Sequence, residues 1–330
     1  MRALHILGKG KVEIAEFPTP VPKENEVLIK VTASGVCGSE MHGLRAEQPQ
    51  AMNGGHEVAG VVADPNGHAQ WEAGDEVVVF TLQGCGKCRW CRAGQDTFCT
   101  QVGAPAATHA QYITSKANGM VKKPTDLSWP LTVMLGGDGL GVPYGASTRA
   151  GVKRGDITVV FGCGPVGLGM VLVQAFLGAH VIAVEPSEAR RKLAMKMGAW
   201  ATLAPAPVPE MVATLKGMTD GVGPDKMFEA VGRQETLDIA IEATRPEGVI
   251  MCAGHGKQSI DPQKLIVKRN LTMMGNWVSH PGWFPGMLQM WREGLDVPRL
   301  ITGIYPYEQA QTAYTEMLEG RSGKTILTWE

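Results

Sequence analysis

Short β-branched runs dominate the chain up to about residue 135, and each run is bounded by Gly, Pro or Asp. The runs at residues 27–31, 58–62 and 76–80 predict strands, and little helical periodicity separates them. Strands that follow one another without intervening helices are typical of an antiparallel, barrel-like domain. We therefore expect a β-rich domain in the first part of the chain.

From about residue 140 the pattern changes to an alternation of apolar strands and amphipathic helices. In chain order, the predicted elements are a buried strand at 156–161, a helix at 167–177, a strand at 180–184, a helix at 187–197, strands at 226–229, 248–252 and 271–275, and a last helix at 307–319. This alternation predicts βαβ units around a parallel sheet. The proline-rich stretch at 204–209 predicts a surface loop.

Length and charge narrow the possible classes of function. A chain of 330 residues exceeds the usual limit for one hydrophobic core, so we expect two domains. The net charge of −1 offers no basic excess for nucleic acid or anionic lipid, and no apolar run is long enough to span a bilayer. The N-terminus opens into a strand-like pattern without an apolar signal core, so we expect a cytoplasmic protein that binds neither nucleic acid nor membrane.

Four of the seven cysteines lie within fifteen residues, spaced as Cys85-x2-Cys88-x2-Cys91-x7-Cys99. Reduced thiols at this spacing are typical of zinc, which prefers four soft ligands in a tetrahedron. A closed four-thiolate site has no open position for a substrate, so we expect a structural zinc. A zinc-ribbon nucleic-acid module uses similar ligands, but the balanced charge and the α/β half of the chain argue against it.

A glycine-rich turn, Gly162-x-Gly164-x-x-Gly167, follows a predicted strand and opens a predicted helix. In this context the motif indicates a dinucleotide site, because the glycines permit a tight turn and close approach of a pyrophosphate to the helix N-terminus. Pro165 and Val166 occupy the first turn of that helix. We expect all five residues at the cofactor.

Glu185 follows the next predicted strand, eighteen residues after Gly167. An acidic side chain at this place hydrogen-bonds the adenosine ribose 2′-hydroxyl and repels a 2′-phosphate, which favours NAD over NADP. Arg190 and Arg191 lie nearby, and an arginine can accommodate the extra phosphate. NADP therefore stays open as the less favoured cofactor.

Two short motifs, Cys37-Gly38-Ser39-Glu40-Met41-His42 and Gly55-His56-Glu57, are weak signals when taken alone. Together with the cysteine loop they resemble the zinc-dependent medium-chain alcohol and polyol dehydrogenases, over essentially the whole chain. The resemblance implies an α/β protein with a GroES-like antiparallel β-barrel catalytic domain at 1–139 and a doubly wound, parallel-sheet Rossmann domain for NAD at 140–274. Residues 275–330 are then expected to return to the catalytic domain.

The resemblance also implies a catalytic zinc, so we expect two zinc ions per chain. In the family a Cys, a His and a third residue, either Cys or Glu, hold this metal with one position open. The matching residues are Cys37 and His56, and the third position falls on Asp138, which departs from the usual pattern. Asp138 binds the zinc directly, binds it through water or acts as a nearby charge; an Asp that caps a glycine-rich turn is the alternative without metal.

Four further roles follow from the resemblance. Glu40 matches the residue that orients the imidazole of His56, and Glu57 matches the carboxylate behind the zinc. Ser39 matches the hydroxyl that accepts the substrate proton, and His42 the residue that passes it towards solvent through the cofactor ribose. Ordinary loop polarity is the alternative for Ser39 and His42. On the cofactor side, the resemblance places Arg190 beside the adenine and three residues close to the adenosine and nicotinamide portions: Val231, Ala253 and Asn276.

The pocket positions of the family correspond here to polar residues, Thr81 and His109. With Asn276 and His280 they favour a hydroxylated substrate such as a polyol, a diol or a sugar derivative. A predicted loop adds aromatic side chains that form either an apolar wall of this pocket or, with the histidines, part of an oligomer interface: Trp277, Trp283 and Phe284.

These features predict a homo-oligomeric, NAD-dependent zinc dehydrogenase, with a tetramer favoured over a dimer. It is expected to oxidise a secondary or polyhydroxylated small-molecule alcohol by hydride transfer to nicotinamide. A non-catalytic NAD-binding redox sensor and an NADP-preferring alcohol or aldehyde reductase remain as alternatives. A zinc-free enone reductase on the same fold is disfavoured by the cysteine loop and by the pair Cys37 and His56.

Overall fold

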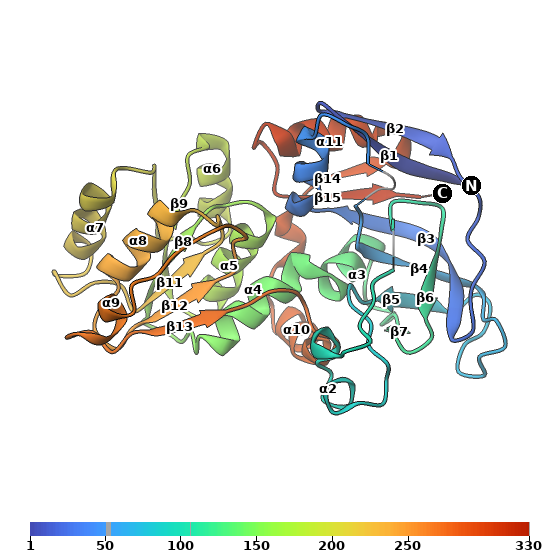
Figure 1. The fold of residues 1–330 in the computed structure, drawn as a ribbon, viewed down its shortest axis with the longest axis horizontal. Helices are drawn as coiled ribbons and strands as arrows, with labels where there is room; N and C mark the ends of the chain where they lie inside the picture. Colours follow the sequence, from blue (N-terminus) through green and yellow to red (C-terminus); the bar gives the residue numbers. More distant parts are fainter. Residues whose placement is uncertain (51–53, 106, 330) are drawn as a thin grey trace. The chain divides into compact units, whose positions relative to one another are not determined.

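The computed structural model describes residues 1–50, 54–105 and 107–329, and they form two compact units. The first unit comprises Met1–Gly141 and Val278–Glu330, and the second comprises Val142–Trp277 (Figure 1). Each unit is described by itself below. Within the described ranges, no helix combines the length and the apolar character that crossing a membrane requires.

A seven-stranded sheet organises the first unit. Its order is β14 (Ile301–Pro306), β15 (Lys324–Thr328), β3 (Glu26–Val36), β4 (Glu57–Asp64), β5 (Glu76–Val79) and β7 (Met120–Lys122), with β6 (Tyr112–Lys116) also paired to β3. All pairs are antiparallel except β14 with β15. A separate hairpin joins β1 (Arg2–Gly8) to β2 (Lys11–Glu16). The expected antiparallel, barrel-like domain is confirmed.

The long strand β3 is the centre of this unit because it pairs with β4, β6 and β15 along its eleven residues. Register shifts between Leu28 and Ile29 and between Val31 and Ala33 mark bulges, which bend a strand and let it serve several partners. The alternating side chains of Val27, Ile29 and Val31 point into the core.

Short helices connect and cover these strands. In chain order they are η1 (Gly38–Glu40), α1 (Met41–Arg45), α2 (Arg89–Arg92), η2 (Asp96–Phe98), α3 (Trp129–Gly136), η3 (Pro281–Trp283), α10 (Phe284–Arg292), η4 (Val297–Leu300), η5 (Tyr307–Gln309) and α11 (Ala310–Leu318). The last helix buries Ala310, Tyr314 and Met317, as its sequence period predicts.

Helices α3 and α4 (Asp138–Arg149) were not expected from the pattern of apolar residues. Helix α3 is buried from Leu131 to Gly136 and therefore has no polar face to produce a helical period. Helix α4 contains three glycines and Pro143, all of which are unfavourable within a helix. Only its first four residues belong to the first unit.

A six-stranded parallel sheet forms the second unit. Its order is β10 (Ala201–Leu203), β9 (His180–Val184), β8 (Ile157–Phe161), β11 (Lys226–Glu229), β12 (Val249–Cys252) and β13 (Thr272–Gly275). The connecting helices include α5 (Pro165–Phe176), α6 (Glu188–Lys196), α7 (Val208–Gly217), α8 (Gln234–Ala243) and α9 (Gln263–Ile266) (Figure 1). The order reverses between β8 and β11, which is the Rossmann arrangement, and the predicted fold class is confirmed.

One strand of this unit was not expected, and one expected loop is shorter than predicted. Residues 201–203 form the edge strand β10, which is too short to show a period. The predicted surface loop at 204–209 is interrupted because α7 begins at Val208, with Pro209 in its first turn. Proline is compatible with that position, since the first helical amides have no acceptor within the helix.

Candidate active site and metal centres

The four thiols of the cysteine loop converge. The Sγ atoms of Cys85, Cys88, Cys91 and Cys99 all lie within 4.8 Å of one another. None of the seven cysteines forms a disulfide, and all seven lie in the described ranges. The turns that bring the four thiols together require glycine at Gly94, whose φ of 68° is unfavourable for other residues.

The charges of this loop fit a cation bound by thiolates. Backbone N–H groups of Lys87 and Cys88 lower the pKa of Cys85 to about 6, against its small burial penalty. Burial and the neighbouring thiols raise the pKa of Cys91 to about 12. Four close thiols cannot all ionise without a compensating cation, and zinc supplies that charge in tetrahedral thiolate sites. The donor set therefore fits a structural zinc.

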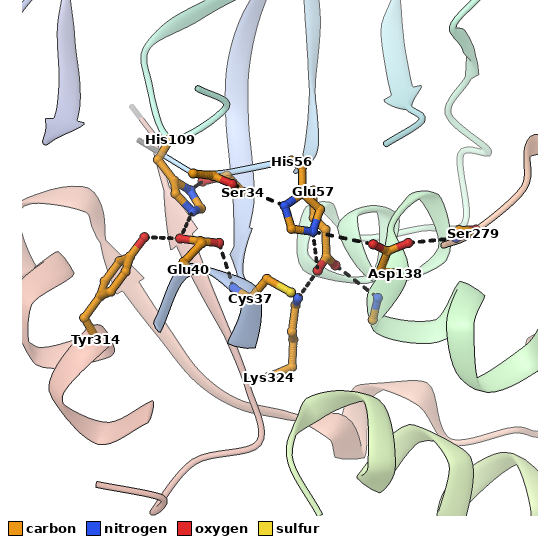
Figure 2. A network of polar contacts seen from close by, with 12 residues as sticks. Ser34, Cys37, Glu40, His56, Glu57, His109, Asp138, Ser279, Tyr314 and Lys324 are labelled. Atoms are coloured by element: carbon orange, nitrogen blue, oxygen red, sulfur yellow. Dashed lines mark hydrogen bonds and ion pairs between the residues drawn. The ribbon is translucent and has the colours of Figure 1, made fainter. Parts of the chain in front are cut away.

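The pairing of β3 with β4 brings a second donor set together. Gly35 is opposite Glu57 in the antiparallel register, so the residues just beyond these strand ends, Cys37 and His56, become neighbours. One ligand atom from each of Cys37, His56 and Glu57 lies within 4.8 Å of the other two. The two short sequence motifs thus form one cluster (Figure 2).

Asp138 also reaches this cluster, from the first residue of α4. Its Oδ2 lies 3.5 Å from Nε2 of His56, and its Oδ1 accepts a hydrogen bond of 2.8 Å from the Ser279 N–H (Figure 2). The other ring nitrogen of His56 contacts the Gly54 carbonyl oxygen at 3.3 Å. The imidazole therefore presents Nε2 to the cluster.

The cluster attracts positive charge. Burial lowers the pKa of His56, but hydrogen bonds with Asp138 and Cys37 and the charge of Glu57 outweigh it and raise the pKa to about 12. A thiolate, an imidazole and a carboxylate are the donor types of a catalytic zinc. The residues present therefore fit this metal.

Two carboxylates compete for the third ligand position. Glu57 has an oxygen within 4.8 Å of the Cys37 and His56 donor atoms, but that residue is fully buried and its Oε1 lies 3.9 Å from His56 Nε2, against 3.5 Å for Asp138. Its two oxygens already contact the Lys324 ammonium group and the Gly139 N–H (3.1 Å). The Oδ2 of Asp138 contacts only His56 among the described residues. Asp138 is therefore the carboxylate whose oxygen is directed to the cluster, and Glu57 lies behind it, paired with Lys324.

Glu40 was expected to orient the imidazole of His56, and its carboxylate makes its hydrogen bonds with other residues. Its Oε1 accepts a hydrogen bond of 2.9 Å from the Cys37 N–H, and its Oε2 contacts Nε2 of His109 at 3.0 Å and the hydroxyl of Tyr314. Among the described residues, the hydrogen bonds of Glu40 go to these three groups, and His56 acts on it only through its charge. Glu40 therefore holds the backbone of Cys37, and the imidazole that it contacts belongs to His109.

His109, expected at the substrate pocket, belongs to a buried network of hydrogen bonds. Its side chain is fully buried, and its Nδ1 contacts the Ser34 hydroxyl at 2.7 Å. The Trp329 indole N–H donates to the same hydroxyl at 2.8 Å. Burial raises the pKa of Glu40, but the attraction of His109 and the hydrogen bonds from His109 and Tyr314 lower it to about 2. The sequence contains no local signal for this network, because its members lie far apart in the chain.

The predicted proton-transfer residues are exposed: Ser39 lies in η1 and His42 in α1. Thr81 is buried, and its hydroxyl has no hydrogen-bond partner among the described residues, which fits a group that awaits a polar ligand. His280 is also buried and contacts the hydroxyl of Thr97 at 3.0 Å.

The predicted aromatic loop is only partly a loop. Phe284 begins α10, is buried and packs edge-to-face on Phe80 at 5.9 Å. Trp283 ends η3, whereas Trp277 ends the second unit and is 55% exposed.

The glycine-rich turn has the geometry expected of a dinucleotide site. Gly162 has a φ of 85°, and a Cβ on Gly167 would lie 1.8 Å from the Gly162 carbonyl oxygen. A Cβ on Gly164 would meet nothing within 4 Å, which leaves open space before α5. Pro165 and Val166 are the first residues of that helix. Free N–H groups at a helix N-terminus suit a pyrophosphate.

Glu185 lies against this turn. Its carboxylate accepts hydrogen bonds from the N–H groups of Cys163 (2.7 Å) and Ser187 (2.9 Å). Arg191 donates to the carbonyl oxygens of Glu185 and Pro186, both at 2.7 Å, and is therefore occupied by the backbone. Arg190 lies in the first turn of α6.

Three predicted cofactor residues follow the carboxyl ends of parallel strands, where ligands bind in such sheets: Val231, Ala253 and Asn276. Asn276 is buried, and its side chain binds Arg149 (3.0 Å) and the Val142 carbonyl oxygen (3.3 Å). Sequence reasoning missed Glu229, which ends β11 and is buried. Its Oε1 accepts hydrogen bonds from the N–H groups of Val231 and Gly232. An acidic residue at the end of an apolar strand is the sequence feature that could have identified it.

Comparisons with known proteins agree with this geometry. Residues 23–125 match the model of the alcohol dehydrogenase GroES-like domain, and residues 165–293 match the model of the zinc-binding dehydrogenase. An L-threonine 3-dehydrogenase of Pyrococcus furiosus is 32% identical over 333 positions, covering 95% of this chain and 94% of the relative. A probable D-xylulose reductase A of Emericella nidulans is 28% identical and covers 97% of this chain and 94% of its own.

Among solved structures, an alcohol dehydrogenase from Thermus sp. ATN1 matches with a TM-score of 0.88 and 26% identity, over 100% of both chains. A 2R,3R-butanediol dehydrogenase from Bacillus subtilis has the same fold, with a TM-score of 0.83, 24% identity and 99% of both chains covered. The chain therefore belongs to the zinc-dependent medium-chain dehydrogenase family and is an oxidoreductase that acts on small-molecule alcohols.

Proposed function

We propose that the protein is an NAD-dependent dehydrogenase of a secondary or polyhydroxylated alcohol, with Cys37, His56 and Asp138 as the ligands of its catalytic zinc. The observation that carries this proposal is the closeness of the Cys37 and His56 donor atoms, which lie within 4.8 Å of each other, together with the Oδ2 of Asp138 at 3.5 Å from His56 Nε2. The cysteine loop would hold a second, structural zinc.

When bound, zinc lowers the pKa of a substrate hydroxyl and polarises the product carbonyl. The chain's own residues prepare the site for it. Glu40 holds the Cys37 backbone, Lys324 neutralises Glu57, and the Ser279 N–H aims Asp138. One thiolate and one carboxylate balance the charge of Zn²⁺, so the centre is close to neutral.

Proton transfer is assigned to exposed groups of η1 and α1. The Oγ atom of Ser39 would accept the proton of the alcohol, and the imidazole of His42 would pass it to water. Both side chains are solvent-exposed, so a proton can leave them.

NAD is proposed over NADP because of Glu185. Its carboxylate is anchored at the glycine-rich turn, where a ribose 2′-hydroxyl could donate to it and a 2′-phosphate would be repelled. Arg191, the nearest arginine in sequence after Arg190, donates to backbone oxygens and is not available for that phosphate in this arrangement.

A hydroxylated, polar substrate is proposed because of the buried hydroxyl of Thr81, which lacks a protein partner among the described residues. The relatives named for L-threonine and D-xylulose act on compounds of that kind. We further propose that the protein is cytoplasmic and forms a homo-oligomer, a tetramer rather than a dimer. Light scattering of the purified protein measures the mass of the assembly and tests the oligomeric state directly.

The deciding experiment combines metal analysis with a substrate screen. We expect about two zincs per chain, and absorbance of reduced nicotinamide with secondary alcohols and polyols in the presence of NAD. His56→Ala should lose one zinc and activity, whereas the control His68→Ala, in a surface turn, should keep both. A wild type with one zinc confined to the cysteine loop, or His56→Ala with undiminished activity, would overturn the proposal.

A further inference from the structure

The direction of the Asp138 carboxylate depends on Ser279. The Ser279 N–H donates to Oδ1 at 2.8 Å, which leaves Oδ2 facing His56 at 3.5 Å (Figure 2). Ser279 also packs on the next turn of α4, since a Cβ on Gly141 would lie 2.0 Å from the Ser279 Oγ. Ser279 therefore contacts the helix that carries Asp138 at two positions one turn apart, Asp138 and Gly141.

The cysteine loop holds this backbone from the other side. The Thr97 hydroxyl donates to the Ser279 carbonyl oxygen at 3.4 Å, and Nδ1 of His280 contacts the same hydroxyl at 3.0 Å. A hydroxyl can donate once and also accept, so it can bind the Ser279 carbonyl oxygen and an Nδ1–H of His280 at the same time. All three residues are buried, so water does not compete for these contacts.

A second contact joins the same two segments through their backbones. The Gly282 N–H donates to the Gly94 carbonyl oxygen at 2.9 Å. A Cβ on Gly94 would lie 2.6 Å from the Cα of Gly282, so the segments approach as closely as glycine allows. The ring of His280 also lies 5.1 Å from that of Phe98. Gly94, Thr97 and Phe98 all lie between Cys91 and Cys99, so the metal-bound shape of the loop determines where these contacts occur.

We propose that the cysteine loop positions the catalytic carboxylate: Thr97 and His280 hold the Ser279 backbone so that its N–H aims Asp138 at the catalytic metal. Thr97 and His280 are therefore positioning residues for the reaction. This inference rests on the proposed function in one respect, namely that Asp138 is a ligand of the catalytic zinc. It assigns to the structural metal a second role, which is to set the geometry of the other centre.

The test must separate the two metal centres in one sample. The protein is loaded with ¹¹³Cd at both sites, and its NMR spectrum should show two resonances, because four thiolates shift cadmium differently from a mixed sulfur, nitrogen and oxygen set. Thr97→Val removes the hydroxyl with little change of shape. We expect it to move the mixed-donor resonance, to leave the four-thiolate resonance in place, and to weaken zinc at the catalytic centre about tenfold in chelator competition.

Matched variants make the result specific. Thr97→Ser keeps the hydroxyl and should restore the wild-type spectrum and affinity, whereas Thr100→Val, at an exposed position of the same loop, should change neither. His280→Phe removes the donor to Thr97 but keeps a ring against Phe98, so it should reproduce the effect of Thr97→Val. If Thr97→Val does not fold, His280→Phe provides an independent test of the same contact.

The experiment distinguishes a failure of the coupling from a failure of the ligand assignment. If Asp138→Asn moves the mixed-donor resonance while Thr97→Val and His280→Phe leave it unchanged, the coupling is overturned and the ligand assignment stands. If Asp138→Asn itself leaves that resonance and the zinc affinity unchanged, the ligand assignment is wrong and the coupling has no target.

Discussion

Replacing His109 with leucine tests whether His109 stabilises the buried carboxylate of Glu40. In the structure the carboxylate of Glu40 is buried and has three partners: the Cys37 N–H, the Tyr314 hydroxyl and His109 Nε2. Removing one partner of a buried charged pair costs about 3–5 kcal/mol. Two donors remain here, so we expect the lower end, about 3 kcal/mol of unfolding free energy, or roughly 150-fold in the folding equilibrium.

Urea titration of the zinc-saturated protein measures this loss, from the shift of the midpoint at a common slope. The control is His68→Leu, because the ring of His68 makes no hydrogen bond within the described ranges and its removal should cost little. Adding Glu40→Gln to His109→Leu removes the charge left behind, so the double variant should recover part of the loss. A cost below about 1 kcal/mol for His109→Leu, or simple additivity in the double variant, would refute the reasoning.

Three further outcomes are expected. Because the folded-state pKa of Glu40 is lowered to about 2 from 4.5, its ionisation adds stability above pH 4.5 that is lost as the pH falls towards 2; the acid-unfolding curve of Glu40→Gln should therefore be flatter over this interval, and parallel curves would contradict the assignment. Lys324→Met leaves the buried Glu57 carboxylate without its cation and should cost about 3–5 kcal/mol in urea titration, whereas Lys324→Arg, which keeps the charge, should cost less; equal losses would show that charge is not the cause. Glu185→Gln removes the repulsion of a 2′-phosphate and should raise the ratio of kcat/KM for NADP to that for NAD at least about fivefold, while an unchanged ratio would exclude Glu185 from cofactor selection.

Local patterns predicted the parts of the fold that have a clear period or a clear motif. The parallel strands at 157–161 and 180–184 are buried apolar runs, and the helix at 310–318 has one apolar face, so both types were recognisable. Helix α3 was not recognisable because it is buried on all sides, and α4 because glycine and proline interrupt it. Burial and tertiary contacts stabilise these two helices, and neither can be read from adjacent residues.

The same distinction holds for the candidate site. Cys37 and His56 were found because the motifs around them are local. The contact of Glu40 with His109 was not predicted, since spacing gives the sequence neighbours of a carboxylate but not its direction, and His109 lies 69 residues away in the chain. Lys324, which neutralises Glu57, lies 267 residues from it, and Ser279 lies 141 residues from Asp138. Sequence alone could not supply these long-range contacts.

The glycines around Asp138 bear on how a short carboxylate could serve as the proposed ligand. Aspartate has one methylene group fewer than glutamate, so its main chain would have to come nearer to a bound metal. A Cβ on Gly136 would lie 2.4 Å from Val78 Cγ1, and one on Gly137 would lie 2.7 Å from Glu57 Cγ. Glycine at these two positions therefore allows the backbone to pack this closely against Val78 and Glu57. With Asp138 as the proposed ligand, the distance to the metal would depend on these glycines as well as on residue 138, and Asp138→Glu would require the main chain to move back.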